Sequence, residues 1–441
     1  MKLRRIIPSL TFALILAGGA IAALVIPHPE FSNIESRDLA LPPKFVADGK
    51  INPSFFAELT TYYTDAFPLR EQFVKASRRV NKAYEYTPIK DSISGVIFID
   101  RIEHRPQDVA TDDDIDDYVE PPTGSDTTLP AATYTPPPEP NVDKMSSRAI
   151  VGDRAFELYK YEPYRTAKFA ENANKVAEIA GIPTYVVIPP TASELYLPQN
   201  IRDKENNQAQ MYEYLGTAID KAVFIDLREE YERDKDKYIY FRSDHHWTAD
   251  GAYLAYAGFM RATGAAPTLR TTLTSGIRYG FLGSLYRAIA DMPASELMEN
   301  NPDYVRFYYP KHESSVISYK NEEMRGGTEM QLVNPEFNKT TNLYEIFLGG
   351  DSPLLHIQNP PDDTNGKTLI IIRDSYGHAF LPFIANDYTD IYVLEPRYFT
   401  SFDLSALIKN VNADELLLLN YAFPATSDYW QDWNTELEKF R

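Results

Sequence analysis

Short apolar runs and amphipathic segments alternate along the C-terminal two-thirds of the chain. Runs of three to five β-branched and aliphatic residues predict buried strands, whereas apolar positions spaced three and four apart predict helices. Strands are expected at residues 95–99, 149–151, 184–188, 223–226, 368–372, 390–394 and 415–419, and helices at 166–180, 206–221, 252–262, 379–386 and 404–411. Buried strands separated by helices indicate an α/β fold in which a parallel sheet carries helices on both faces.

The N-terminal part of the chain follows a different pattern. Residues 1–5 are a short basic lead, and residues 6–26 are free of charge over a length that lets a helix cross a bilayer. Basic residues before this run and none behind it predict that the lead lies in the cytoplasm and the body outside. We interpret the run as a transmembrane anchor; a cleaved signal peptide and a buried core helix are the alternatives. Residues 27–105 then begin the ectodomain, with helices expected near 55–67 and 70–84.

Residues 106–143 interrupt this organisation. They contain ten Asp or Glu, no Lys or Arg and three consecutive prolines, and they supply about half of the net charge of −19. A composition with so few apolar residues cannot offset chain entropy by burying surface, so it predicts a disordered insertion. Its acidic run lacks the glycine and the spaced ligands of a calcium-binding loop. Residues 144–441 are then expected to form one α/β domain.

The overall composition excludes several classes of protein. A chain of 441 residues with 44% hydrophobic residues can bury a substantial core. An isoelectric point near 4.9 argues against nucleic-acid binding, which needs basic patches, but it is compatible with a neutral polysaccharide. The absence of cysteine rules out disulfides, thiolate zinc sites and a cysteine nucleophile.

Two distant segments carry the candidate chemistry. They read Ser243-Asp244-His245-His246-Trp247-Thr248 and Arg373-Asp374-Ser375-Tyr376-Gly377, and the second follows the predicted strand at 368–372. An acid, an imidazole and a serine at a strand-to-helix turn are the parts of a nucleophilic hydrolase or acyltransferase. The first segment follows the apolar run at 238–241 and the second follows the run at 368–372, so both are expected just past strand ends, where α/β sheets gather their chemistry. We therefore predict Ser375 as nucleophile, His246 as its base and Asp244 as the residue that orients the imidazole.

The first segment also allows two other interpretations. Thr248 is a suitable helix N-cap with Asp250 in the first turn, so the segment is also compatible with a simple helix entry. Alternatively, Asp244, His245 and His246 are suitable ligands for a divalent metal ion. The triad interpretation requires neither a metal nor a cofactor.

Several neighbouring residues are expected to support the triad or to contact substrate. They are His245, Trp247, Arg373, Tyr376, Gly283 and Asn420. His245 is expected to donate a structural hydrogen bond, and Trp247 to wall the pocket or stack on a sugar ring. Backbone N–H groups at the turn after Ser375 are suited to an oxyanion, with the loop at Gly283 and the strand-ending Asn420 as further candidates. A simple turn and a simple strand end are the ordinary explanations of these last two.

The segment Asp244-His245-His246-Trp247 resembles the signature of the bacterial DHHW proteins. These are grouped with the SGNH hydrolase-like alginate acetyltransferases of the AlgX and AlgJ type, in which the Asp-x-His pair precedes the serine. The resemblance extends to Asn33-x-Glu35-x-Arg37-x-Leu39-Ala40 and to Asp65-Ala66-Phe67-Pro68-x-Arg70, and so covers most of the chain except the acidic insertion. One departure is Arg373, which stands where ordinary SGNH enzymes have the glycine of Gly-Asp-Ser; it is expected to alter access or hold substrate.

The resemblance implies an SGNH hydrolase-like fold and an O-acetyltransferase that modifies a cell-envelope or secreted polysaccharide through an acyl-serine. It also implies a cell-membrane location with an extracytoplasmic body, and a membrane-bound O-acyltransferase as partner. With water as acceptor the same triad would make a polysaccharide deacetylase. A catalytically silent protein that binds polysaccharide or scaffolds an assembly is the third possibility.

Overall fold

The computed structural model describes residues 148–159, 161–199, 208–290, 295–337, 342–422 and 433–441, together with Arg202 and short pieces between residues 31 and 99. The chain divides into two compact units. One contains residues 1–90, 289–293 and 338–342, and the other contains residues 91–288, 294–337 and 343–441. The predicted membrane segment, the acidic insertion and most of the helices expected near 55–67 and 70–84 lie outside the described residues.

In the first unit the described strands form two short antiparallel pairs. β1 (Phe31–Ser32) pairs with β2 (Arg37–Asp38), and β3 (Val46–Ala47) pairs with β4 (Lys50–Ile51). Among the described residues of the whole chain, no helix combines the length and the apolarity needed to cross a bilayer.

An eight-stranded sheet forms the centre of the second unit. Its order is β13 (Thr328–Met330), β12 (Ser315–Tyr319), β14 (Leu354–Gln358), β16 (Asp390–Leu394), β15 (Thr368–Arg373), β17 (Glu415–Leu419), β8 (Thr184–Val187) and β9 (Val223–Ile225). The five strands from β16 to β9 are parallel to one another. The strands β14, β12 and β13 pair antiparallel at the other edge.

The antiparallel edge corrects the prediction of a parallel sheet. In β12 only Val316 is buried, whereas every residue of β17 is buried. An antiparallel strand can face solvent on one side, so it lacks the continuous apolar run by which the parallel strands were recognised. The α/β class and the five parallel strands were predicted correctly.

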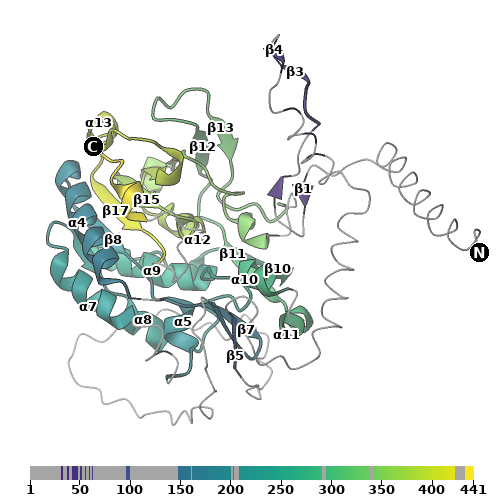
Figure 1. Ribbon diagram of the computed structural model, residues 1–441. Coiled ribbons are helices and arrows are strands. Elements are labelled where there is room, and N and C mark those ends of the chain that lie inside the picture. The colour runs from purple at the N-terminus through teal and green to yellow at the C-terminus, as the bar shows by residue number, and fades with distance from the viewer. Residues whose placement is uncertain are drawn as a thin grey trace, which may run out of the picture. The chain divides into compact units, whose positions relative to one another are not determined.

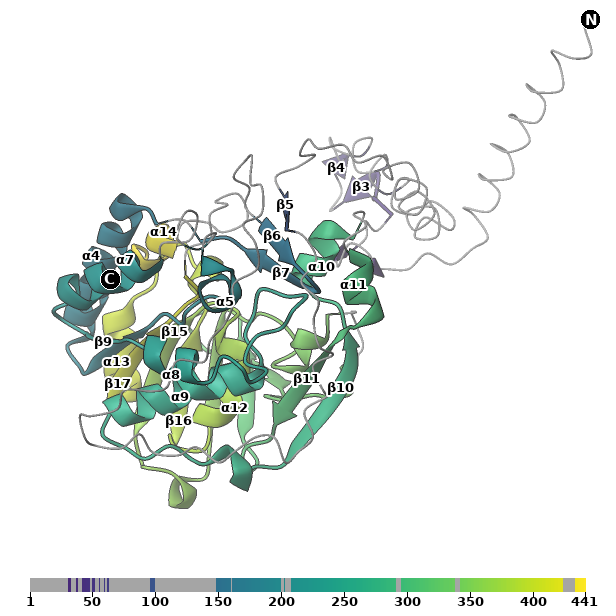
Figure 2. The same ribbon diagram turned by 90° about the horizontal axis from the view of Figure 1, so that it is seen from below.

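Helices cover both faces of this sheet, as predicted (Figure 1). The helices α4 (Pro163–Ala180), α7 (Gln208–Ala218) and α13 (Leu404–Val411) cover one face, and α9 (Ala249–Ala262) and α12 (Gly377–Ile384) cover the other. Figure 2 shows α4 and α7 on one side of β15, with α9 and α12 on the other. Along β15, Leu369 and Ile371 join the core under α9 and α12, and Ile370 and Ile372 join the other core, which is the period of two expected of a strand.

The five predicted helices are present, with ends shifted by at most three residues. α4 begins early because Pro163 occupies its first turn, where a missing N–H costs nothing. α9 begins at Ala249 because the Thr248 side chain accepts a hydrogen bond from the N–H of Gly251 at 3.3 Å. The predicted helix entry at Thr248 is therefore correct, and it leaves the Asp-His-His segment free to form the loop before the helix.

The remaining elements surround the sheet. They are the three-stranded β5 (Val96–Ile99), β6 (Arg148–Val151) and β7 (Arg154–Glu157), the antiparallel pair β10 (Ser275–Phe281) and β11 (Asp303–Tyr308), the helices α5 (Ala192–Tyr196), α8 (Arg228–Arg233), α10 (Ser284–Ile289), α11 (Ser295–Asn300) and α14 (Trp433–Leu437), and the 3-10 turns η2 (Arg270–Thr272), η3 (Leu343–Ile346), η4 (Pro361–Asp363) and η5 (Pro396–Tyr398). The strands expected at 95–99 and 149–151 correspond to β5 and β6.

Candidate active site

Ser375 lies in the turn between β15 and α12, at the carboxyl end of a central parallel strand, and its side chain is partly exposed. The turn is tight: the N–H of Gly377 donates to the carbonyl of Asp374 at 3.0 Å, and that of His378 to the carbonyl of Ser375 at 3.2 Å. A Cβ at Gly377 would lie 2.8 Å from the Cγ of Arg373. Glycine therefore lets α12 start directly over the Arg373 side chain.

The loop that carries the histidines precedes α9, and its two ends pair with each other. The expectation that a strand at 238–241 ends just before this loop is wrong: of these residues only Tyr240 pairs, in an isolated antiparallel bridge with Trp247 across the base of the loop. The buried carboxylate of Asp303, the first residue of β11, accepts from the backbone N–H groups of Ser243 at 2.8 Å and Arg242 at 3.1 Å. These bonds fix the loop where it enters the site.

The structure brings the three predicted triad residues together. His246 Nε2 lies 2.8 Å from Ser375 Oγ, and His246 Nδ1 lies 2.6 Å from Asp244 Oδ1. Asp244 Oδ1 also accepts the backbone N–H of His246 at 2.9 Å, and its Oδ2 accepts the N–H of Ser284 at 2.7 Å. Burial opposes the charged form, but His246, His245 and these hydrogen bonds hold the pKa of Asp244 well below its usual range. The acid is therefore a carboxylate at neutral pH.

Two aromatic side chains cross-link the histidine loop to the serine turn. The indole N–H of Trp247 donates to the carbonyl of Tyr376 at 3.0 Å, and the hydroxyl of Tyr376 donates to the carbonyl of His245. Both side chains are fully buried. The expectation that Trp247 walls the pocket or stacks on a sugar ring is therefore wrong. Its ring is buried between the histidine loop and the serine turn and cannot contact substrate.

A third cross-link comes from η3. The ring of Tyr344 stacks on the imidazole of His246, with centroids 3.9 Å apart and planes at 13°. Its hydroxyl donates to the carbonyl of Ser375 at 3.1 Å. One side chain therefore contacts both the imidazole and the turn that carries the serine.

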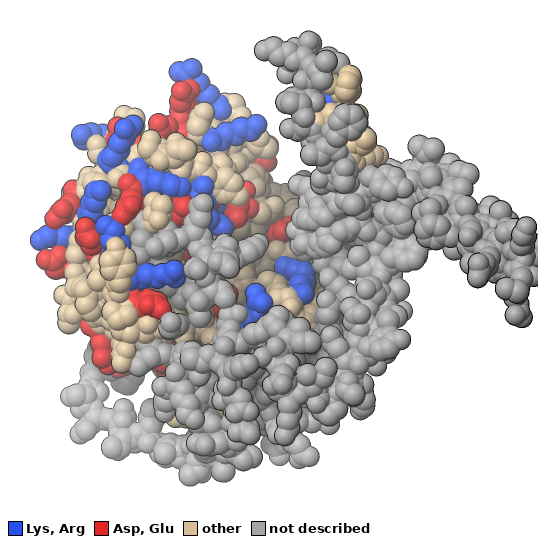
Figure 3. Space-filling model, viewed as in Figure 1, with Lys and Arg blue, Asp and Glu red and all other residues tan. Residues whose placement is uncertain are grey.

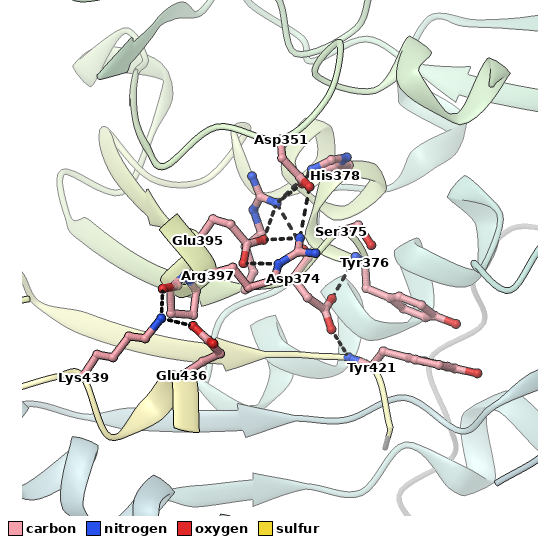
Figure 4. Close-up of polar contacts among 12 residues, drawn as sticks. Asp351, Asp374, Ser375, Tyr376, His378, Glu395, Arg397, Tyr421, Glu436 and Lys439 are labelled. Atoms are coloured by element: carbon pink, nitrogen blue, oxygen red, sulfur yellow. Dashed lines mark hydrogen bonds and ion pairs between the residues drawn. The ribbon is translucent and has the colours of Figure 1, made fainter. Parts of the chain in front are cut away.

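Arg373 is fully buried, so the expectation that it holds substrate or alters access is wrong. Its Nη1 lies 3.2 Å from Asp351 Oδ1, 3.2 Å from Glu395 Oε2 and 2.8 Å from His378 Nε2. Arg397 contacts the same two carboxylates (Figure 4). Asp351 and Glu395 surround Arg373 because a buried cation needs carboxylate partners. The cluster adjoins the serine turn, since Arg373 is the last residue of β15.

Asp374 ties the serine turn to the end of β17. Its carboxylate accepts the N–H of Tyr376 at 2.9 Å and the N–H of Tyr421 at 2.7 Å (Figure 4). Burial nevertheless raises the pKa of Asp374 to about 7. The N–H groups of Tyr376 and Gly377 are thus both engaged by Asp374, which leaves neither of them for the predicted oxyanion role.

The other predicted supporting residues lie around the acid and the sheet edge. His245 Nδ1 lies 2.7 Å from Ser284 Oγ, which fits its predicted structural hydrogen bond, and burial lowers its pKa to about 4. Gly283 lies against Asp244, and its N–H donates to Ser243 Oγ at 3.0 Å, so it serves the acid rather than an oxyanion. The side-chain amide of the buried Asn420 donates to the carbonyl of Tyr421 at 2.9 Å.

The geometry also bears on the metal interpretation. Asp244, His245 and His246 each place one ligand atom within 4.8 Å of the others, as a metal site requires. However, both carboxylate oxygens of Asp244 accept hydrogen bonds, and His246 Nε2 contacts the serine hydroxyl. These partners suit an acid–base–nucleophile relay better than a set of metal ligands.

Sequence reasoning missed three residues that shape this site: Tyr344, Asp303 and Ser284. All three lie between residues 263 and 367, where the sequence has no regular strand–helix pattern. A Tyr, an Asp and a Ser in such a stretch carry no local signal, since their roles depend on packing against a loop far away in sequence.

The site of this α/β domain is of the Asp–His–Ser triad class, with the serine at a strand-to-helix turn. The sequence profile described as DHHW protein matches residues 109–394, well over half of the chain, so the chain belongs to the DHHW family. No curated protein sequence matches the chain significantly.

The solved structures that are similar in fold include the following two. A DHHW family protein from Eubacterium siraeum DSM 15702 is 23% identical with a TM-score of 0.56, over 65% of this chain and 92% of that chain. Bacillus cereus PatB1, solved with a sulfonyl adduct, is 17% identical with a TM-score of 0.52, over 66% of this chain and 96% of that chain. At these identities the comparison establishes a shared fold.

Proposed function

We propose that this protein is a serine-dependent O-acetyltransferase that acts on a polysaccharide outside the cytoplasm. The observation that carries the proposal is the relay from Asp244 through His246 to Ser375, with contacts of 2.6 and 2.8 Å. A serine hydroxyl becomes a competent nucleophile when an adjacent base accepts its proton. The sulfonyl adduct of PatB1, which shares the fold, supports the same chemistry because sulfonyl reagents modify activated nucleophiles.

In the first half-reaction, Ser375 Oγ attacks the carbonyl carbon of an acetyl ester or thioester while its proton passes to His246 Nε2. A bond forms between Oγ and that carbon, the bond to the leaving group breaks, and His246 returns the proton to the leaving oxygen or sulfur. In the second half-reaction, an acceptor hydroxyl gives its proton to His246 and attacks the acyl-serine. Ser375 then leaves with that proton, and the acetyl group is on the acceptor.

The nature of the acceptor and of the donor partner rests on the family resemblance. A polysaccharide hydroxyl is the proposed acceptor, and a membrane-bound O-acyltransferase is the proposed supplier of acetyl groups. On the face seen in Figure 3, acidic and basic side chains are interspersed over the described residues. Such a mixed surface suits a neutral glycan better than a polyanion, which would favour a basic patch.

The first half-reaction is tested with p-nitrophenyl acetate and the full-length chain. Wild type should release nitrophenol in a burst, and mass spectrometry should find an acetyl group on the peptide that contains Ser375. Ser375→Ala should show neither, and a sulfonyl fluoride should label the wild-type serine alone. Equal burst and labelling in both proteins would remove Ser375 from the mechanism.

The second half-reaction separates the transferase from the two alternatives. With an acetyl donor and a neutral oligosaccharide, the transferase should form an acetylated sugar, whereas a deacetylase should release only acetate. A protein that binds the oligosaccharide but is inert toward every donor would be the scaffold. We expect the acetylated sugar.

A further inference from the structure

We infer that Tyr344 is a positioning residue of the reaction: its ring holds the base His246 face-on while its hydroxyl holds the turn of the nucleophile Ser375. This inference rests on the proposed function, because it concerns how the base and the serine are kept in register. Tyr344 lies in η3, about thirty residues before the serine turn and about a hundred after the histidine loop. It therefore joins the two from a third segment of the chain.

The two side-chain hydrogen bonds of His246 only weakly oppose one motion of its ring, and the rings of His245 and Tyr376 meet the imidazole at tilts of 36° and 41° rather than face-on. Asp244 holds Nδ1 and Ser375 holds Nε2, and both hydrogen bonds lie near the plane of the ring at its two ends. Such bonds resist sliding but only weakly resist a tilt about the line that joins the two nitrogens. A flat ring stacked at 3.9 Å and 13° resists that tilt by direct contact.

The Tyr344 ring is itself held in place. It is 2% exposed and meets Phe241 and Phe347 edge-on, with centroids at 6.2 and 5.5 Å. Its hydroxyl is fixed by the bond to the carbonyl of Ser375. Because the ring cannot swing away, its position is imposed on the imidazole.

The stacking also matches the change of charge during the reaction. When His246 accepts the proton of Ser375 it becomes an imidazolium, and the face of an aromatic ring attracts a cation, more strongly where water is excluded. The contact is therefore stronger in the transition state than in the resting enzyme. An interaction of that kind raises kcat and leaves KM nearly unchanged.

The test compares three variants of the full-length chain with wild type, using the burst with p-nitrophenyl acetate. Tyr344→Leu removes ring and hydroxyl, and should lower kcat about tenfold with KM within about twofold of wild type. Tyr344→Phe keeps the ring and should retain most of kcat. Tyr212→Leu is the matched control, since Tyr212 is also buried and donates to a backbone carbonyl, that of Ile188, at 2.6 Å, but packs in the core under α4 and α7.

Each outcome decides the question. A Tyr344→Leu protein with wild-type kcat, or with a loss no larger than that of Tyr212→Leu per folded molecule, would overturn the inference. A Tyr344→Phe loss equal to that of Tyr344→Leu would assign the effect to the hydroxyl and overturn the role of the ring. If Tyr344→Leu does not fold, Tyr344→Met replaces it, because methionine fills irregular space. The proposed function fails separately, if wild type shows no burst or Ser375→Ala keeps it.

Discussion

At the scale of single residues, the site depends on the three hydrogen bonds that hold the Asp244 carboxylate in place. One carboxylate oxygen takes the ring and backbone N–H groups of His246, and the other takes the N–H of Ser284. With the acid so engaged, the proton of the neutral imidazole stays on Nδ1 and leaves Nε2 to accept the serine proton. The acid thus determines which nitrogen faces Ser375.

Asp244→Asn tests this role. An amide of the same shape favours the wrong tautomer, so we expect kcat for nitrophenyl acetate to fall about 10³- to 10⁴-fold while the protein stays folded. Asp226→Asn is the control, because Asp226 is an exposed surface acid paired with Arg228. Wild-type turnover by Asp244→Asn would contradict the assignment.

Gly283 is required by the same acid. A Cβ at this position would overlap the Cβ and Oδ2 of Asp244, so Gly283→Ala should displace the carboxylate. We expect turnover to fall about 10²-fold, since misplaced catalytic groups cost that much. Gly216→Ala is the matched control: an added Cβ meets nothing within 4 Å in α7, and the variant should be more stable by about 0.5–1 kcal/mol. Urea denaturation and turnover, measured on both, separate folding from activity.

At the scale of elements, the serine turn is held between β15, β17 and a buried group of charges. Asp374 joins it to the end of β17, and Arg373 anchors it from below. The turn therefore has its own polar framework, which is independent of the triad.

Arg373→Met should destabilise this framework. It removes a fully buried cation from Asp351 and Glu395, and breaking a buried ion pair costs about 3–5 kcal/mol. The free energy of unfolding in urea measures the loss. Lys235→Met, which breaks the exposed pair with Glu232, should leave it nearly unchanged. Equal stability of Arg373→Met and wild type would show that the cluster does not support the fold.

Asp374 makes the stability of the fold depend on pH. Burial raises its pKa from 3.8 to about 7, so the folded state binds the proton more tightly than the unfolded state. Its contribution to stability is complete below about pH 4, decreases as pH rises, and levels off above about pH 7. Asp374→Asn should therefore flatten the decline in unfolding free energy between pH 4 and 7. An unchanged decline in the variant would refute the assignment.

At the scale of the whole molecule, the chain combines an α/β body with an N-terminal segment that lies outside the described residues. We propose that the apolar run at 6–26 carries the body across the membrane. Alkaline phosphatase fused after residue 30 should then be active in bacterial cells, because it folds only outside the cytoplasm. Deletion of residues 6–26 should abolish that activity. An inactive fusion with the run intact would place the body inside.

The sequence alone determined the strands β8, β9, β15, β16 and β17, the helices α4, α7, α9, α12 and α13, and the candidate residues Asp244, His246 and Ser375. This was possible because buried strands and helices leave a regular pattern of apolar positions in the sequence, and because the serine turn directly follows the parallel strand β15. The resemblance to the DHHW proteins also lay in a few contiguous residues.

Only the tertiary structure decided the antiparallel edge of the sheet, the burial of Trp247 and Arg373, and the contacts of Tyr344 and Asp303. Each of these depends on which distant segments of the chain meet. Residues on an irregular loop show no sequence pattern that predicts their contacts. From the sequence, an arginine or a tryptophan next to a catalytic residue cannot be assigned to the substrate pocket or to the core. Packing removes that ambiguity, since a buried cation requires carboxylates around it and a buried indole requires an acceptor.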